Sequence, residues 1–369
     1  MKRMEKILLA KKLDGILVSS PANMRSSTGF RGEGIVFISR NRPLVFTDYR
    51  YTIAAKQECP EADVIQYKKN IYENWLTELV ERLGREAVAG MSIGFEDETM
   101  TVQTYQTILA LIKKHELENM TLVPLHKQLD QLRQVKTEQE LLDIEKAEQI
   151  GDRAFTRIVE KIREIRGRKE DLTEKQVAAY LEFCMKEMGA EGTSFDTIAA
   201  SGIHSSMPHA IPTDKALEEG DFLTMDFGCR VNGYCSDMTR TVVIGRAGER
   251  QKEIYDVVLR AQTAAIQAVK PGIKGCEVDA VARDIIREAG YGDCFGHSLG
   301  HSVGLMIHET PCFSPKDETV LEPGMVITVE PGIYVEGFGG VRIEDVVAVT
   351  EEGCRNLTHS PKELMELIK

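Results

Sequence analysis

The sequence lacks the features that mark membrane-spanning and secreted proteins. No apolar run approaches the roughly 20 residues that a transmembrane helix needs. Residues 1–15 are basic but have neither a sustained apolar segment nor a small-residue cleavage site, so they predict an amphipathic helix rather than a signal peptide. The eight cysteines show no CxxC spacing, which argues against a disulfide framework and a zinc finger. We therefore expect a cytoplasmic protein with reduced thiols and no membrane partner.

A basic excess, which a nucleic-acid partner would require, is also lacking. The chain has 58 acidic and 46 basic side chains and a formal net charge of −12. Binding to a phosphate backbone calls for a positive surface instead. No glycine-rich phosphate loop occurs in the first third of the chain. We therefore expect no nucleic-acid partner, and we assign the first third no chemistry.

What is present predicts two domains, because 369 residues are too many for one typical core. Residues 1–131 alternate short apolar runs with helical patterns, which indicates an α/β layout around a mixed sheet. Residues 132–369 place helices between antiparallel strand pairs, which is typical of an α+β domain. Strands are expected at 15–20, 34–39, 44–47, 63–66, 92–95, 121–124, 193–202, 325–330 and 341–349, and helices at 51–57, 72–83, 102–114, 137–165, 173–188, 250–269 and 276–288.

The most informative stretch is 222–243, FLTMDFGCRVNGYCSDMTRTVV. Asn-Gly at 232–233 lies between two apolar segments and predicts a two-residue hairpin loop, because both turn residues tolerate positive φ. Gly228 would then face Asp237, and Asp226 and Asp237 would project from one face, roughly 7 Å apart. A three-residue loop would separate the two aspartates, whereas a bulge or a longer loop would have to restore their shared face.

A second motif is GHSLGHSVGLMIHE at 296–309. Its three histidines, His297, His301 and His308, stand among glycines, which disfavour a regular helix and allow the backbone to approach another group closely. Any one of these histidines taken alone is most simply a hydrogen-bonded loop residue. Three of them in one short stretch require a common explanation.

Two apolar strands near the C-terminus also carry charge. Glu330 ends the strand in MVITVEPGIYV, and in GGVRIEDVVAV (339–349) Arg342 and Glu344 are expected on one strand face. Each has an ordinary explanation when taken singly, since Glu330 can point to solvent and Glu344 can pair with Arg342. Buried carboxylates are unfavourable without a positive partner, however, so their recurrence in one domain indicates a shared cause.

The simplest shared cause is a pair of metal ions. Asp226, Asp237, Glu330 and Glu344 carry four negative charges, which two divalent cations would neutralise; without cations these carboxylates would protonate or move apart. Oxygen ligands with a single imidazole favour manganese, with cobalt and zinc as alternatives. We therefore expect two divalent metal ions per chain.

Taken in this order, DFG…SDMTRT, GHxxGHxxGLxxHE, VEPGIY and GVRIED resemble the motifs of the pita-bread metallopeptidases, which include aminopeptidase P, prolidase and, more distantly, methionine aminopeptidase. The resemblance covers the whole chain. Residues 132–369 resemble the pita-bread catalytic domain, and residues 1–131 resemble the smaller α/β creatinase-type N-terminal domain of the proline-specific branch. The implied fold is α+β.

The resemblance implies a role for each matching residue. Asp226 would be the terminal ligand of one metal, Asp237 and Glu344 would bridge both metals, and His301 and Glu330 would complete the second site. Glu330 would also accept a proton from the nucleophilic water. The remaining catalytic positions are two histidines that would contact substrate around the scissile bond and two supporting residues: His209, His308, His297 and Arg342.

The implied reaction is hydrolysis of the bond between an N-terminal residue and proline by a hydroxide that two metal ions share. This bond lacks the N–H that ordinary peptidases contact. The expected partners are a peptide with proline in second position and, by resemblance, a second copy of the chain. We expect an Xaa-Pro aminopeptidase, because Cys312 replaces a basic residue that in prolidase-like members lies near the C-terminal carboxylate of the substrate.

Three alternatives remain. One is an Xaa-Pro dipeptidase, or prolidase, which acts on the dipeptide alone. The other two are a metal-free amidinohydrolase similar to creatinase and a catalytically silent binding protein of the same fold. Both would be expected to lose metal ligands, and this sequence retains all five ligand types.

Overall fold

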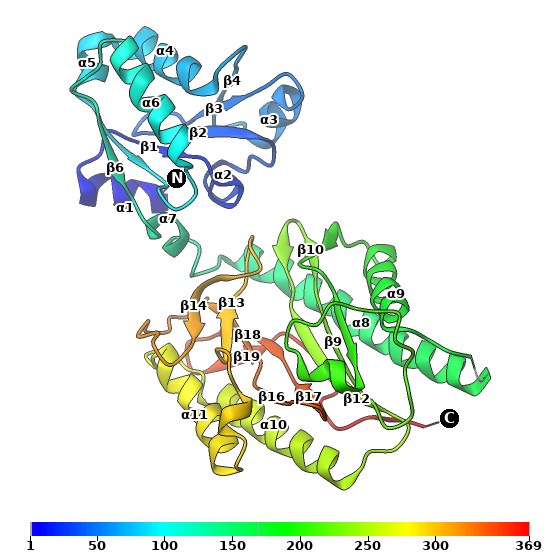
Figure 1. Ribbon diagram of the computed structural model, residues 1–369. Helices are drawn as coiled ribbons and strands as arrows, with labels where there is room; N and C mark the ends of the chain where they lie inside the picture. The colour runs from blue at the N-terminus through cyan, green and yellow to red at the C-terminus, as the bar shows by residue number, and fades with distance from the viewer. Residues whose placement is uncertain (1, 169, 369) are drawn as a thin grey trace. The chain divides into compact units, whose positions relative to one another are not determined.

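The computed structural model describes residues 2–168 and 170–368. The chain divides into two compact units, Met1–Arg133 and Gln134–Lys369 (Figure 1). The boundary expected from the sequence lies between residues 131 and 132. Among the described residues, no helix is both long and apolar enough to cross a membrane.

The first unit is built around a six-stranded mixed sheet with the order β4-β3-β2-β1-β5-β6. The pairs β1–β2 and β2–β3 are antiparallel and the other three pairs are parallel. The strands are β1 Gly15–Val18, β2 Gly34–Ile38, β3 Leu44–Thr47, β4 Asp63–Gln66, β5 Ser92–Phe95 and β6 Thr121–Pro124. The helices are α1 Lys2–Lys11, α2 Pro21–Thr28, α3 Thr52–Glu58, α4 Ile71–Leu83, α5 Arg85–Ala89, α6 Val102–Lys114 and α7 Gln128–Gln131.

Alternating strand residues cover both faces of this sheet with apolar side chains, as period-two geometry dictates. Phe37 packs with Trp75 of α4 and Ile108 of α6 on one face, while Val36 packs with Leu8 of α1 on the other. The predicted α/β layout is confirmed. Three helices, α2, α5 and α7, were not predicted. The helices α5 and α7 have only five and four residues, and α2 has the mainly polar sequence PANMRSST, so none of them shows an apolar period.

The second unit contains four sheets, with the orders β20-β12-β9-β8, β14-β13-β15-β18-β19, β11-β10-β7 and β16-β17. Its strands are β7 Gly192–Thr193, β8 Ile198–Ser201, β9 Phe222–Phe227, β10 Cys229–Val231, β11 Tyr234–Cys235, β12 Met238–Ile244, β13 Gly300–Ser302, β14 Glu309–Phe313, β15 Val326–Val329, β16 Gly332–Val335, β17 Gly339–Arg342, β18 Asp345–Val349, β19 Cys354–Asn356 and β20 Glu366–Leu367. Its helices are α8 Glu138–Arg168, α9 Glu174–Glu187, α10 Glu249–Ala268 and α11 Gly275–Glu288, with short 3₁₀ turns at Gly202–Ser206 and Gly292–Cys294.

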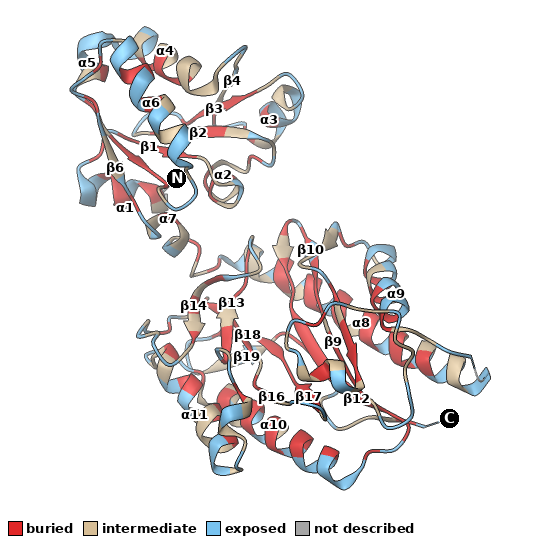
Figure 2. Ribbon diagram, in the orientation of Figure 1, coloured by how far each residue is buried: buried red, intermediate tan, exposed pale blue. Residues whose placement is uncertain are grey.

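Two helix pairs cover the sheets of this unit. The buried faces of α8 and α9 pack with β9 and β12, and those of α10 and α11 pack with β15 and β17 (Figure 2). The predicted capping boxes are both present. Thr137 and Glu140 bond reciprocally at the start of α8, and Thr173 and Gln176 do so at the start of α9. Four amphipathic helices therefore hold the strands that carry the polar motifs.

The predicted two-residue loop at 232–233 is confirmed. Val231 pairs with Tyr234, and the same register pairs Asp226 with Thr239 farther along. The hairpin is nevertheless divided between two sheets: β9 and β12 belong to one sheet, β10 and β11 to another, and Gly228 separates β9 from β10. A Cβ added at Gly228 would lie 1.9 Å from the carbonyl oxygen of Ser236, so only glycine fits this crossing.

Two expected strands were wrong in their extent. The expected strand at 341–349 is broken after Arg342, so that β17 and β18 belong to different sheets and Glu344 lies between them. Similarly, the expected strand at 193–202 is split into β7 and β8. Residues at both breaks line one cavity.

Candidate metal centre

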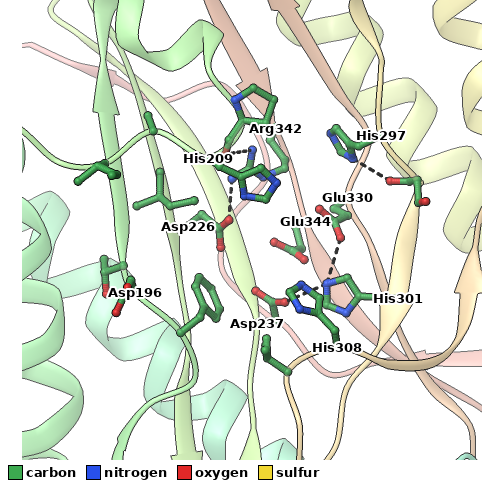
Figure 3. Close-up of a pocket in the computed structure, with 18 of the residues that line it drawn as sticks. Asp196, His209, Asp226, Asp237, His297, His301, His308, Glu330, Arg342 and Glu344 are labelled. Carbon is green, nitrogen blue, oxygen red and sulfur yellow. Dashed lines mark hydrogen bonds and ion pairs between the residues drawn. The ribbon is translucent and has the colours of Figure 1, made fainter. Parts of the chain in front are cut away.

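A cavity of about 540 Å³ in the second unit contains every residue that the sequence singled out for chemistry. Figure 3 shows these side chains converging from separate strands. The residues are Asp226, Asp237, His301, Glu330 and Glu344, with His209, His297, His308 and Arg342 around them. Apolar side chains complete the lining on another part of the wall, among them Phe195, Ile198, Pro212 and Ile307.

Different strand ends deliver the five expected ligands. Asp226 lies in β9, Asp237 immediately precedes β12, and His301 lies in β13. Glu330 follows β15 directly, and Glu344 directly precedes β18. Strand ends are the places where a side chain can leave the packed sheet and still be held by backbone hydrogen bonds, so this cluster is held by two sheets at once.

Three of these residues form a compact cluster. One ligand atom from each of Asp237, His301 and Glu344 lies within 4.8 Å of the others. His301 Nε2 is 3.6 Å from Asp237 Oδ2 and 3.4 Å from Glu330 Oε1. His301 Nδ1 lies 3.3 Å from the carbonyl oxygen of Ser302, and donation of its proton there leaves the Nε2 lone pair facing the carboxylates. A neutral ring in this orientation is suited to ligate a metal.

Burial strongly perturbs these groups. It raises the pKa of Glu330 to about 8 and lowers that of His301 to about 4. Burial, followed by repulsion from neighbouring carboxylates, raises the pKa of Asp237 and Glu344 well above the usual range. Each shift opposes the charged form, so the cluster is unfavourable in its ionised form unless a cation lies among the oxygens.

Asp226 provides an independent test of whether a cation fits. Its Oδ2 accepts a hydrogen bond from Arg342 Nη2 at 2.6 Å, but its Oδ1 is buried and has no hydrogen-bond partner among the described residues. A buried carboxylate oxygen without a partner is costly. An oxygen-preferring metal ion would satisfy it, so the residues present fit the expected group.

Arg342 supports two of the carboxylates at once. Besides its ion pair with Asp226, its Nε donates to Thr239 Oγ1 at 3.0 Å. Thr239 Oγ1 in turn donates to Glu344 Oε2 at 2.6 Å. The simple explanation that Glu344 is present only to pair with Arg342 is therefore wrong, since Arg342 pairs with Asp226 and reaches Glu344 through Thr239.

Tyr334 is a site residue that the sequence did not single out. Its hydroxyl lies 2.8 Å from Arg342 Nη1 and 3.0 Å from His297 Nε2. In β16, Tyr334 pairs with Gly340, two residues from Arg342 on the neighbouring strand. Residues two apart on a strand point to the same face, so Gly340 and Arg342 share a face, and Tyr334, which pairs with Gly340, lies near Arg342. The contact between Tyr334 and Arg342 could be predicted only from the register of the 332–342 hairpin.

His297 has both ring nitrogens occupied. Its Nδ1 lies 2.8 Å from the carbonyl oxygen of Ser298, and its Nε2 faces the Tyr334 hydroxyl. Burial and, next, the nearby Arg342 charge lower the pKa of His297 to about 4. A neutral ring would donate to Ser298 and accept from Tyr334, which indicates a positioning role for His297. His209 and His308, by contrast, are exposed toward the cavity (Figure 3).

Glu148 is a second residue that was missed. It is fully buried on α8, where its Oε1 accepts from the backbone N–H of Asp237 and its Oε2 accepts from Thr358 Oγ1, both at 2.8 Å. Burial raises its pKa to about 8. A glutamate at a core position of an amphipathic helix was the available signal, because Ala147 and Ile144 line the same buried face.

The raised carboxyl pKa values predict how the metal-free protein responds to pH. Because the folded state holds protons that the unfolded state releases above about pH 4.5, their contribution to stability is lost as pH rises through about 8. We expect the melting temperature of metal-free protein to fall between about pH 5 and 8, and we expect Mn²⁺ to reduce that slope. The pKa of Glu148 is also raised, and Glu148 is not among the expected metal ligands, so its share of the pH dependence should remain with and without Mn²⁺. Calorimetry across this range with and without Mn²⁺ checks this, and equal slopes would contradict it.

Comparisons with known proteins agree with this geometry. The profile of metallopeptidase family M24 matches residues 143–351, and that of the Creatinase/Prolidase N-terminal domain matches residues 1–135. The Xaa-Pro dipeptidase of Pyrococcus furiosus is 40% identical over 371 residues, which cover 99% of each chain.

Solved structures are similar over nearly the whole chain. An Xaa-Pro dipeptidase from Bacillus anthracis has a TM-score of 0.90 and 40% identity, covering 99% of this chain and 98% of its own. An X-Pro aminopeptidase from Thermotoga maritima has a TM-score of 0.86 and 38% identity, covering 96% of this chain and 97% of its own. Two substrate classes are thus represented among similar structures.

Proposed function

Because the chain belongs to metallopeptidase family M24, we propose that it is a dinuclear, metal-dependent Xaa-Pro dipeptidase. Family membership confirms the resemblance seen in the motifs, and with it the α+β pita-bread domain, the creatinase-type N-terminal domain and the assignment as a hydrolase. The dinuclear centre, the residue roles and the exact substrate are proposals.

The observation that carries the proposal is the convergence of four carboxylates and one neutral imidazole on a single cavity. Asp226, Asp237, His301, Glu330 and Glu344 would hold two divalent cations, with manganese preferred because the ligands are mainly oxygen. When bound, such cations lower the pKa of a shared water and polarise the scissile carbonyl.

Other side chains would accept the proton, bind the substrate and orient the catalytic groups. Glu330 Oε1 lies within 3.1 Å of Thr328 Oγ1, which orients the carboxylate that would accept the proton of the attacking water. His209 and His308 are exposed to the cavity and would hydrogen-bond the substrate around the scissile bond. Arg342 and His297 would hold the surrounding groups in place through Tyr334. The apolar wall would exclude water from the proline side of the substrate.

The choice of dipeptidase over aminopeptidase follows the names of similar proteins. Proteins named Xaa-Pro dipeptidase are 40% identical to this chain over 99% of its length, and they favour this alternative over the aminopeptidase expected from the sequence. The aminopeptidase remains a second candidate for two reasons. Cys312, opposite His301 on β14, stands where a basic residue was expected, and an X-Pro aminopeptidase structure is also closely similar.

Substrate length separates the two candidates. We expect the manganese-loaded protein to hydrolyse an Xaa-Pro dipeptide with a higher kcat/KM than the corresponding Xaa-Pro-Xaa tripeptide, because a site built for dipeptides holds the free proline carboxylate. Parallel assays of one dipeptide and its tripeptide extension measure the ratio. A clear preference for the tripeptide would replace the dipeptidase by the aminopeptidase.

The setting of the protein is also proposed. All eight cysteines are free thiols, which supports a reducing cytoplasm. The family resemblance supports a homodimer, and the acidic net charge of −12 supports a peptide rather than a nucleic acid as partner.

A further inference from the structure

A buried ion pair lies outside the set of residues used above. Lys136 and Glu309 have side chains that are only 1% and 2% exposed, and Lys136 Nζ is 3.3 Å from Glu309 Oε2. The same Nζ donates to Ser302 Oγ at 3.0 Å. Next to Lys136, the Gln134 side chain donates to Thr310 Oγ1 at 3.0 Å. The segment that precedes α8 therefore contacts both β13 and β14 through side-chain hydrogen bonds and an ion pair.

The ion pair lies at the base of a loop. Ser302 and Glu309 pair across β13 and β14, and together they close the loop 303–308. Inside the loop, the backbone N–H of Met306 donates to Glu309 Oε1 at 3.3 Å. A Cβ added at Gly304 would lie 2.6 Å from Glu309 Oε2, so the loop folds closely around this carboxylate.

Both ends of the loop adjoin active-site histidines. His301 immediately precedes Ser302, and His308 immediately precedes Glu309. The two imidazole rings meet edge to face, with centroids 4.5 Å apart. Because Glu309 is bonded directly to His308, a displaced Glu309 would displace His308, whereas the backbone N–H of His301 is held separately by Thr328 Oγ1 at 3.0 Å.

We propose that the Lys136–Glu309 ion pair positions His308 against the substrate, and that Lys136 is a positioning residue for the reaction. This inference rests on the proposed function, in which His308 contacts the substrate. A buried ion pair is by itself weak evidence for stability, because desolvation offsets most of the attraction. The pair instead orients the loop. The Lys136 ammonium group contacts both Ser302 and Glu309 at the base of the loop, and the Glu309 carboxylate accepts a hydrogen bond from within it.

The test compares Lys136→Met with Lys146→Met, which removes an exposed lysine of α8. Hydrogen exchange of full-length protein, read by mass spectrometry over residues 303–309, needs no turnover. We expect faster exchange there in Lys136→Met and no change in Lys146→Met. Unchanged exchange in Lys136→Met would overturn the proposal. If Lys136→Met does not fold, Glu309→Gln takes its place, because the amide keeps the size of the side chain but removes the charge that pairs with Lys136; faster exchange over residues 303–309 is again expected, and unchanged exchange would overturn the proposal.

Kinetics distinguish positioning from general structural support. We expect Lys136→Met to lower kcat/KM for an Xaa-Pro dipeptide by roughly tenfold to a hundredfold with the metal content unchanged, as small misplacements at reacting centres do. In a His308→Ala background the same substitution should cost almost nothing, because its effect is transmitted through His308. Losses that multiply in the double variant would overturn the proposal. A wild type that hydrolyses no Xaa-Pro peptide would remove the proposed function, while the exchange experiment would still decide whether the pair holds the loop.

Discussion

Replacing Asp237 by asparagine is expected to prevent loading of the shared metal position and to reduce kcat/KM by about a thousandfold or more. A carboxylate oxygen of Asp237 lies within 4.8 Å of ligand atoms from His301 and Glu344. The amide keeps the shape of the side chain but removes the charge that would bridge two cations. Loss of about 4 kcal/mol of metal-supplied transition-state stabilisation corresponds to this factor. Elemental analysis and dipeptide hydrolysis measure the two effects.

The stability of the same variant shows whether the loss is specific. Burial and nearby carboxylates raise the pKa of Asp237, so its charge is unfavourable when no metal is present. The metal-free Asp237→Asn variant should therefore melt at a higher temperature than metal-free wild type at pH 8. The matched control is Asp256→Asn, an exposed residue of α10 that pairs with Arg260. Full metal content and near-normal activity in Asp237→Asn would contradict the bridging role.

Replacing Glu330 by glutamine should lower kcat by about 100-fold to 10,000-fold, which is the usual contribution of a positioned proton acceptor. The amide oxygen can still reach a cation, but it cannot take a proton from water. Assays at saturating Mn²⁺ separate this loss from weakened metal binding, and they should show a much smaller change in KM than in kcat.

Glu336→Gln is the matched control, because Glu336 is exposed six residues farther along the chain. It should retain wild-type kcat. If Glu330→Gln also retained wild-type kcat at saturating metal, another group would have to accept the proton, and the assignment of Glu330 would be limited to metal binding.

The residues that the sequence singled out all line one cavity, but their arrangement around it was predicted less well. Parity along the hairpin was enough to place Asp226 and Asp237 in a common register, because the Asn-Gly loop at 232–233 fixes which residues pair. The motifs around His301 and Glu330 then supplied the remaining expected ligands by resemblance. Such features can be predicted from the sequence because they depend only on the turn residues and on the two-residue period of a strand.

The contacts that were missed join residues far apart in sequence. Nothing local in 339–349 indicates that β17 and β18 enter different sheets, since the apolar alternation continues through the break. The support of Asp237 by Glu148 spans 89 positions, and the Lys136–Glu309 contact spans 173. Such pairings are decided by how helices and sheets pack, which neither periodicity nor motif spacing contains.

The most direct measurement of the central claim is the metal content of the purified chain, paired with Xaa-Pro hydrolysis before and after chelation. The account predicts two divalent ions per chain after reconstitution with Mn²⁺, no hydrolysis once they are removed, and recovery on adding Mn²⁺ back. Hydrolysis that survives complete removal of metal, with no ion recovered from the active protein, would contradict it.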